Sequence, residues 1–325
     1  MSRSMSMPPP IPPPPEFEFL PMGIWINDKK PQAMSDIIGN IPICKLLNQY
    51  ISTGQIPNLL FVGDNGVGKR TLANIFCKSY LNDDLRGRLL IDGAISRGKD
   101  IICETVQDFA HRRITMDKKK IIIITNFDSM THEAQNALRR IMEIENSVRF
   151  ILTCNDMSDI IEALQSRCII LKIKPLDYSE SLELIKKLSN KIPHDIAEII
   201  SLISEGDMKR IINYTQTTAI SNGDINSFHK IFNIPPMKYI EKLLVSVSKG
   251  ESVFEGIDYL MDQGHNYNDI IDILSRILTY RTELLPDDVR YKYLYIVSEH
   301  FCEISPNTVR LHLYALFGKL HCSLN

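Results

Sequence analysis

A strand, a glycine-rich loop and a helix are predicted around the stretch G-D-N-G-V-G-K-R-T, residues 63–71, and this order limits the possible folds more than any other feature. The apolar run L-L-F-V, residues 59–62, is typical of a buried strand, and residues 71–80, T-L-A-N-I-F-C-K-S-Y, have helical spacing. In this setting the pattern G-x-x-x-x-G-K holds phosphate through backbone N–H groups and the lysine. The sequence therefore predicts a P-loop fold.

The loop lacks one group that the pattern normally supplies, because Arg70 stands where a serine or threonine hydroxyl ligates Mg²⁺. Thr71 comes one residue too late, since one helical step turns a side chain by roughly 100°. The strand predicted at residues 121–124 is followed by T-N-F-D, so the carboxylates that hold the metal and polarise water are missing from its end. Asp128 lies further along, and we do not expect it to substitute.

These two losses remove metal ligation and water activation but leave the phosphate loop intact. We therefore expect ATP or ADP to bind, hydrolysis to be slow or absent, and Mg²⁺ at this site to be in doubt. The candidate nucleotide-binding residues of the loop are Gly63, Asp64, Asn65, Gly66, Val67, Gly68, Lys69, Arg70 and Thr71. The charge of Arg70 either approaches the phosphates and partly replaces the metal or points into solvent, and the sequence leaves both alternatives open.

The composition is that of an ordinary globular protein, because 325 residues with 44% hydrophobic content suffice for two or three packed domains. No apolar run reaches the roughly 20 residues of a membrane span, and we recognise no signal peptide. The seven cysteines form no C-x-x-C pair and no metal-ligand spacing with histidines, so we interpret them as reduced core thiols in a cytosol-like compartment. The net charge of −2 confines any nucleic-acid contact to a local basic cluster, found at Arg97, Lys99, Arg112, Arg113 and residues 118–120.

Changes in sequence pattern divide the chain into four segments. Residues 1–23 contain P-P-P-I-P-P-P-P and form a disordered or polyproline II tail. In residues 24–175, apolar strands at 59–62, 121–124 and 149–155 alternate with helical segments, which predicts a parallel sheet covered on both faces. Short helices are expected at 176–233 and amphipathic helices at 234–325, with the boundary near Pro235-Pro236.

Four further motifs occur in order along the chain. They are W-I-N-D-K-K-P at 25–31, T-N-F-D-S-M-T-H-E-A-Q-N-A-L-R-R-I-M-E at 125–143, Q-S-R-C at 165–168 and G-D-M-K-R-I-I-N-Y-T-Q at 206–216. Together they resemble the small subunits of replication factor C, the AAA+ sliding-clamp loader, over nearly the whole chain after the tail. The variant G-K-R-T looks most like the subunit whose own site carries G-K-K-T and a degraded second motif.

The resemblance implies a fold and an assembly. The fold is an α/β AAA+ P-loop domain with a parallel sheet (24–175), followed by a small helical lid (176–233) and an all-α collar that assembles a ring (234–325). In such a ring each ATP site lies between subunits, and the arginine of the S-R-C motif, here Arg167, reaches the neighbour's site. An arginine supplied in trans stabilises the charge that develops on a transferring phosphoryl group.

The resemblance also implies further binding residues. Asn155 matches the family's sensor-1 polar residue, and Lys209 matches its sensor-2 arginine, although lysine loses the planar fork of arginine. The segment at residues 96–110 resembles the family's DNA-tracking segment, with Cys103 where the family has an arginine. It implies contacts to DNA phosphates through Arg97, Lys99, Arg112 and Arg113.

The implied function is that of one small subunit of a hetero-oligomeric loader, which places a ring-shaped clamp on primer–template DNA in replication and repair. Its partners are then other loader subunits, the sliding clamp and DNA, with no membrane, in the nucleus or at a cytoplasmic replication site. Two alternatives stay open. One is a fully active AAA+ ATPase such as a helicase loader, and the other is a scaffold that binds no nucleotide.

Overall fold

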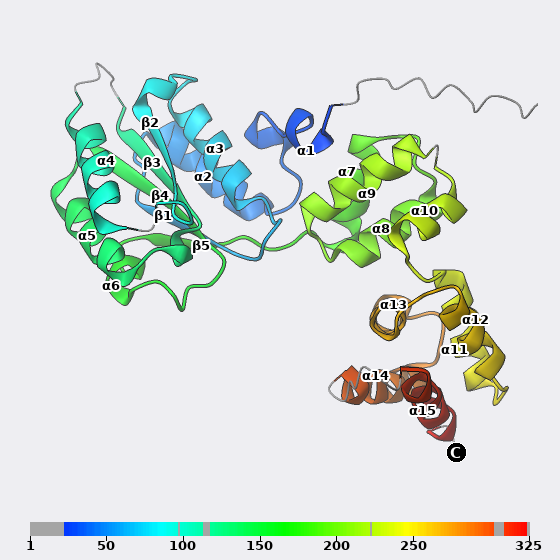
Figure 1. The fold of residues 1–325 in the computed structure, drawn as a ribbon. Coiled ribbons are helices and arrows are strands. Elements are labelled where there is room, and N and C mark those ends of the chain that lie inside the picture. The colour runs from blue at the N-terminus through cyan, green and yellow to red at the C-terminus, as the bar shows by residue number, and fades with distance from the viewer. Residues whose placement is uncertain (1–22, 97, 113–117, 222, 302–308, 324–325) are drawn as a thin grey trace, which may run out of the picture.

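The computed structural model describes residues 23–96, 98–112, 118–221, 223–301 and 309–323. The proline-rich tail up to residue 22, Arg97, Arg113 and Cys302 therefore lie outside the described residues. Figure 1 shows a sheet flanked by helices, beside which the later part of the chain forms two groups of helices. Among the described residues, no helix combines the length and the apolar character needed to cross a membrane.

The elements of the first part are α1 (Trp25–Asp28), η1 (Met34–Asp36), α2 (Ile41–Thr53), β1 (Leu59–Val62), α3 (Lys69–Tyr80), η2 (Leu85–Gly87), β2 (Arg88–Asp92), α4 (Lys99–His111), β3 (Lys120–Thr125), η3 (Phe127–Ser129), α5 (His132–Ile144), β4 (Val148–Cys154), α6 (Glu162–Gln165) and β5 (Ile169–Lys172). The elements of the second part are α7 (Tyr178–Leu188), α8 (His194–Ser204), α9 (Met208–Ile220), α10 (Ile225–Phe232), α11 (Met237–Ser248), α12 (Phe254–Asp262), α13 (Tyr267–Tyr280), α14 (Asp287–Phe301) and α15 (Val309–Cys322). We call α7–α10 the lid and α11–α15 the collar.

The sheet has five strands in the order β2-β3-β4-β1-β5, and every described pair is parallel. The predicted parallel sheet is thus confirmed. Because parallel strands all end at the same edge, this order brings together the loop after β1 and the carboxyl ends of β2, β3 and β4. The candidate nucleotide site lies at this edge.

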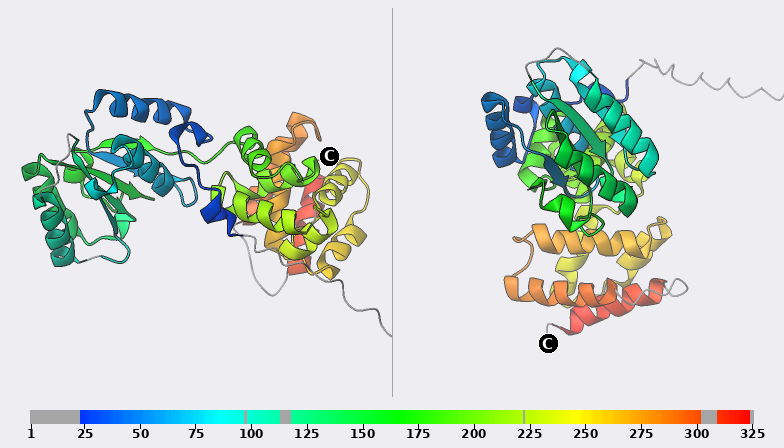
Figure 2. Two further views of the ribbon diagram at one scale, coloured as in Figure 1. Left: turned by 90° about the horizontal axis from the view of Figure 1, so that it is seen from above. Right: turned by 90° about the vertical axis from the view of Figure 1, so that its left-hand side faces the viewer.

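Two buried layers cover the sheet, and β3 shows how the sequence forms both. Its isoleucines alternate, so that Ile121 and Ile123 belong to the apolar cluster of α2 and α3, whereas Ile122 and Ile124 belong to that of α4 and α5. All four side chains are fully buried. A continuous apolar run is therefore what a strand covered on both faces requires, and both views in Figure 2 show the sheet enclosed between helices.

Two strands were not predicted from the sequence, namely β2 and β5. Both strands are short, β2 has a charged residue at each end, and β5 ends with Lys172. The apolar residues of each strand are therefore too few to distinguish it from a loop by sequence pattern. Strand β3 also begins one residue earlier than predicted, at Lys120, which is buried. The Lys120 ammonium donates hydrogen bonds to the backbone C=O groups of Phe109, Ala110 and Arg112, and so caps the carboxyl end of α4.

The lid and the collar share one apolar cluster, which runs from Leu176 in the linker before α7 to Leu320 in α15. The predicted helical lid and all-α collar are therefore present and pack continuously against each other. The described cysteines are free, and Cys77 and Cys154 are buried as expected. Cys103 and Cys168 are half-buried, and Cys322 is exposed because it lies off the face of α15 that carries the buried Leu316 and Leu320, so the prediction of core thiols is wrong at Cys322.

Candidate nucleotide site

The loop after β1 is shaped by glycines. Gly66 and Gly68 have φ angles of 79° and 89°, a left-handed conformation that glycine adopts without steric cost. Gly68 is the N-cap of α3, so the first N–H groups of this helix face the loop with no intrahelical acceptors. Val67 is buried in the apolar cluster beneath, whereas Asp64 and Asn65 are exposed. The loop thus forms the cradle of N–H donors that a phosphate group fits.

Lys69 is the centre of the site. Its ammonium donates to the backbone C=O groups of Gly63 and Asp64 at 2.6 and 2.8 Å, and to Asn155 Oδ1 at 2.8 Å. Burial is the main cause that lowers the pKa of Lys69, and the positive charge of Lys209 also lowers it. Negative groups nearby, among them the Asp128 carboxylate, raise this pKa and offset part of the shift. The Lys69–Asn155 hydrogen bond joins the phosphate loop to the end of β4, and Lys209 is exposed in the first turn of the lid helix α9.

The lid rests directly on the loop. The Met208 backbone N–H donates to the Gly66 C=O at 3.2 Å, and a Cβ placed on Gly66 would lie 1.9 Å from Asp207 Oδ1. Asp207 is the N-cap of α9 and accepts hydrogen bonds from the N–H groups of Lys209 and Arg210. The first turn of α9 is therefore fixed against the phosphate loop, a contact that the sequence did not predict.

Arg70 does not simply point into solvent, because it pairs with a carboxylate at a neighbouring strand end. Its Nη1 lies 3.9 Å from Asp92 Oδ2, at the end of β2, and its side chain is 57% exposed. The other oxygen of Asp92 accepts a hydrogen bond from Asn126 Nδ2 at 2.9 Å. Asp92 thus joins the two positions, 70 and 126, at which the chain departs from an active P-loop site. Sequence reasoning missed Asp92, although a charged residue after the apolar run L-L-I is a signal for a strand end.

The groups available for Mg²⁺ are few. The Thr125 hydroxyl is buried and donates to the Ile91 C=O at 3.4 Å, and Thr71 is half-buried in the first turn of α3. Asp128 Oδ2 accepts the Asn155 N–H at 2.8 Å, whereas its buried Oδ1 accepts no hydrogen bond within the described residues. Across the described part of the chain, no three His, Cys, Asp or Glu side chains gather as a metal site. The donor set fits a phosphate far better than a divalent metal.

Arg167 follows α6 and is exposed at the surface. Its guanidinium donates to the Ala163 C=O at 2.6 Å and pairs with the Glu143 carboxylate, which also pairs with Arg139 at 2.9 Å. The Arg167 side chain is 36% exposed. Glu143, which the sequence did not single out, thus holds Arg167 at the surface in a fixed direction.

The four residues expected to contact DNA are only partly described. Arg97 and Arg113 lie outside the described residues, as does the side chain of Lys99, and Arg112 is exposed at the end of α4. The neighbouring lysines have structural contacts, since Lys118 donates to the Tyr80 C=O and to Asn82 Oδ1. The basic cluster is therefore smaller than residues 97–120 suggest.

The similarity to known proteins is broad. A family model for the DNA polymerase III delta subunit matches residues 90–177. Replication factor C subunit 4 of Encephalitozoon cuniculi is 34% identical, over 78% of this chain and 85% of the relative. Replication factor C subunit 4 of Saccharomyces cerevisiae is 31% identical, over 91% of this chain and 95% of the relative.

Solved structures add evidence on the fold. The RuvB Holliday junction branch migration motor of Thermotoga maritima superposes with a TM-score of 0.54 at 17% identity, over 67% of this chain and 78% of that chain. At this identity the likeness concerns the fold alone. With relatives above 30% identity that are matched over most of their length, the chain belongs to the replication factor C small-subunit family.

Proposed function

We propose that this chain is one subunit of a sliding-clamp loader, that it holds ATP or ADP in its own site without efficient hydrolysis, and that it supplies Arg167 to a neighbouring site. Family membership supports the first part of the proposal. The observation that carries the second part is the network Arg70–Asp92–Asn126 beside an intact phosphate loop.

Nucleotide binding follows from the groups that remain. Lys69 is held by oxygen acceptors that phosphate oxygens can replace, and the N–H groups at the start of α3 face the same space. Asn155, directly after β4, accepts a hydrogen bond from Lys69, and the charge of Lys209 in the lid acts on Lys69. Two ammonium groups and a helix N-terminus form an environment that favours a polyanion.

Slow hydrolysis follows from the groups that are missing or already engaged. Thr125 binds the neighbouring strand, and Asn126 donates to Asp92, so neither can act as a base toward water. Loss of a positioned general base costs on the order of 10²–10⁴ in rate. The Arg70–Asp92 pair is long and largely exposed, so it is weak, and a bound phosphate can compete with Asp92 for the Arg70 guanidinium.

Titration of the purified chain with fluorescent ATP and ADP, with Mg²⁺ and with EDTA, tests the nucleotide proposal. We expect binding that persists in EDTA, and a loss of about 10-fold or more in the Lys69→Ala variant, because a charge-assisted hydrogen bond contributes about 1.5–3 kcal/mol. Absence of binding under both conditions would indicate the scaffold alternative. Rapid turnover that Lys69→Ala abolishes would indicate a fully active ATPase.

The role of Arg167 is tested in a reconstituted complex with the partner subunits. We expect Arg167→Ala to lower DNA-stimulated ATP turnover, because an arginine in trans raises the rate at one phosphoryl-transfer site by about 10³–10⁵. Arg139→Ala is the matched control, since Arg139 pairs with the same Glu143 on the same surface. Equal turnover by the Arg167→Ala complex and the unmodified complex would refute the role.

We also propose that Arg97, Lys99, Arg112 and Arg113 contact DNA phosphates. The exposed Arg112 at the end of α4 supports this proposal. Neutralising all four should weaken DNA binding by the complex and reduce its dependence on salt, since each lost phosphate contact reduces counterion release. Unchanged DNA affinity and salt dependence would count against it.

A further inference from the structure

The four residues Glu205–Met208, which we call the junction segment, lie where the three parts of the chain meet. The Met208 N–H donates to the Gly66 C=O of the phosphate loop at 3.2 Å. The Gly206 C=O accepts the Leu176 N–H of the linker at 3.3 Å. A Cβ on Gly206 would lie 2.2 Å from the Leu176 backbone oxygen, so only glycine allows this approach. The junction segment therefore sets the position of the lid over the phosphate loop.

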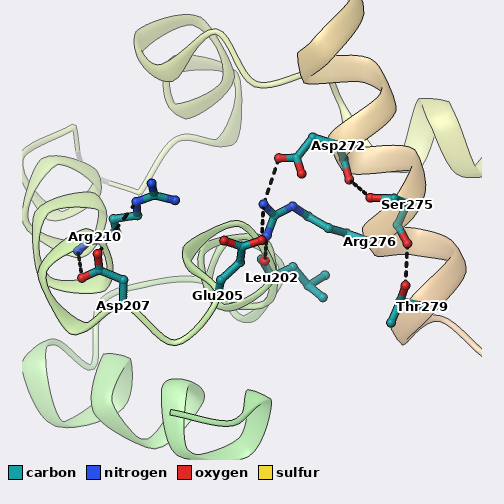
Figure 3. Close-up of polar contacts among 8 residues, drawn as sticks. All are labelled: Leu202, Glu205, Asp207, Arg210, Asp272, Ser275, Arg276 and Thr279. Carbon is teal, nitrogen blue, oxygen red and sulfur yellow. Dashed lines mark hydrogen bonds and ion pairs between the residues drawn. The ribbon is translucent and has the colours of Figure 1, made fainter. Parts of the chain in front are cut away.

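The collar reaches the junction segment through Arg276 of α13, as Figure 3 shows. The Arg276 guanidinium donates to the Leu202 C=O at 2.6 Å and lies 2.9 Å from the carboxylates of both Glu205 and Asp272. The Arg276 side chain is only 10% exposed. The Glu205 and Asp272 side chains are 62% and 48% exposed, so the best shielded of these contacts is the hydrogen bond to the Leu202 C=O, in which the donor is charged.

These contacts stabilise an unusual backbone. Leu202 is in the last turn of α8, where C=O groups lack intrahelical donors and a cation is favoured. Glu205 follows with a φ angle of 51°, a left-handed conformation that a non-glycine residue adopts only at an energetic cost. Arg276 binds both sides of this turn, so the direction in which the chain leaves α8 toward Met208 depends on the collar.

We propose that Arg276 is a positioning residue that couples the collar to the phosphate loop through the junction segment. The lid and collar share one apolar cluster, so they form a continuous body on which Arg276 fixes the turn at Glu205. Movement of this body then changes the Met208–Gly66 contact. Such coupling is reciprocal. The free energy by which the collar position changes nucleotide binding therefore equals the free energy by which bound nucleotide shifts the equilibrium between collar positions. The nucleotide part of this inference rests on the proposed function, whereas the structural part does not.

The Met208 amide provides a direct test in the nucleotide-free full-length chain. This N–H is in the first helical turn and has Gly66 as its acceptor, so its hydrogen exchange reports contact with the phosphate loop. We expect Arg276→Met to accelerate Met208 exchange by about 5-fold or more. The Lys209 and Arg210 amides are internal references, because they donate to Asp207 within the same helix.

Arg281→Met is the matched control variant. Arg281 directly follows α13 and binds Glu198 of α8 at 2.6 Å, and it also pairs with Glu241, but within the described residues its side chain forms no hydrogen bond or ion pair with the junction segment. We expect it to leave Met208 exchange unchanged, and we expect Arg276→Lys to restore part of the protection lost in Arg276→Met. Equal Met208 exchange in the Arg276→Met and Arg281→Met chains would overturn the proposal.

Nucleotide dissociation provides the second readout. We expect Arg276→Met to release fluorescent ADP about 5-fold faster than Arg281→Met. If Arg276→Met does not fold, Glu205→Gln weakens the same ion pair from the exposed partner and should accelerate Met208 exchange in the same direction. If Arg276→Met accelerates Met208 exchange but the chain binds no nucleotide, the proposed function is refuted and the coupling stands. If nucleotide binds normally but Arg276→Met leaves Met208 exchange unchanged, the coupling is refuted and the proposed function stands.

Discussion

Replacement of Gly66 by alanine should separate the lid from the phosphate loop. The added methyl group would lie 1.9 Å from Asp207 Oδ1, and Asp207 cannot simply rotate away because this oxygen caps the first turn of α9. Gly54 provides a matched control. It has a similar φ angle, 69° against 79° at Gly66, but a Cβ placed on it meets nothing within 4 Å.

The two substitutions share one cost and differ in another. A left-handed alanine costs about 1–2 kcal/mol, of which about 0.4–1 kcal/mol is offset by the less flexible unfolded chain. Gly66→Ala additionally loses the Met208–Gly66 hydrogen bond and strains the Asp207 cap, each contributing about 1 kcal/mol. Gly66→Ala should therefore destabilise the lid contact by about 2 kcal/mol more than Gly54→Ala.

Urea unfolding followed by tryptophan fluorescence measures this difference. The chain has a single tryptophan, Trp25, whose backbone N–H donates to Gln216 of the lid helix α9, so its emission reports on the lid. We expect a lower midpoint for Gly66→Ala than for Gly54→Ala. Equal midpoints would refute the conclusion that the lid rests on the loop at Gly66.

Three further predictions concern Lys120, Cys77 and Arg70. Lys120→Met should lower the free energy of unfolding by about 2–4 kcal/mol in the same urea assay, because three C=O groups lose a charged donor. Lys119 is exposed, so the control Lys119→Met should change this free energy by less than about 0.5 kcal/mol. Burial raises the pKa of the Cys77 thiol from 9.0 to about 12. Between pH 9 and pH 12 the unfolded chain therefore loses a proton that the folded chain keeps. The free energy of unfolding should fall in this range by up to about 1.4 kcal/mol for each unit of rising pH. A Cys77→Ala chain should show a shallower decline, and equal slopes would contradict this reasoning. Arg70→Thr alone should not produce efficient ATP hydrolysis in a phosphate-release assay, because Asn126 still provides no carboxylate, and rapid turnover by this variant would contradict the proposed site.

The sheet and the phosphate loop could be predicted because their signals are local. A run such as residues 121–124 favours burial on both faces, and the glycines at 66 and 68 allow the left-handed turn that the loop adopts. Strand β2 could not be predicted in this way. Its five residues are amphipathic only in part, and its pairing with β3 brings together residues more than 30 positions apart.

The contacts that define the site are mostly long-range, and sequence patterns do not report them. Arg70 and Asn126 could be recognised as departures from a pattern, but the Asp92 that joins them depends on strand order. In the same way, the spacing of Asp272 and Arg276 indicates only an ion pair on one helix. The contact of Arg276 with Glu205 depends on how α13 packs against α8.

We propose that the chain's own site holds nucleotide without efficient turnover. The decisive experiment uses a loader reconstituted with partner subunits whose own P-loop lysines are replaced by alanine, so that Lys69 belongs to the only intact phosphate loop. Radiolabelled ATP bound to this complex on primed DNA should remain ATP for many minutes and should be lost in the Lys69→Ala chain. Conversion of the bound ATP to ADP within seconds would show instead that this site hydrolyses ATP efficiently.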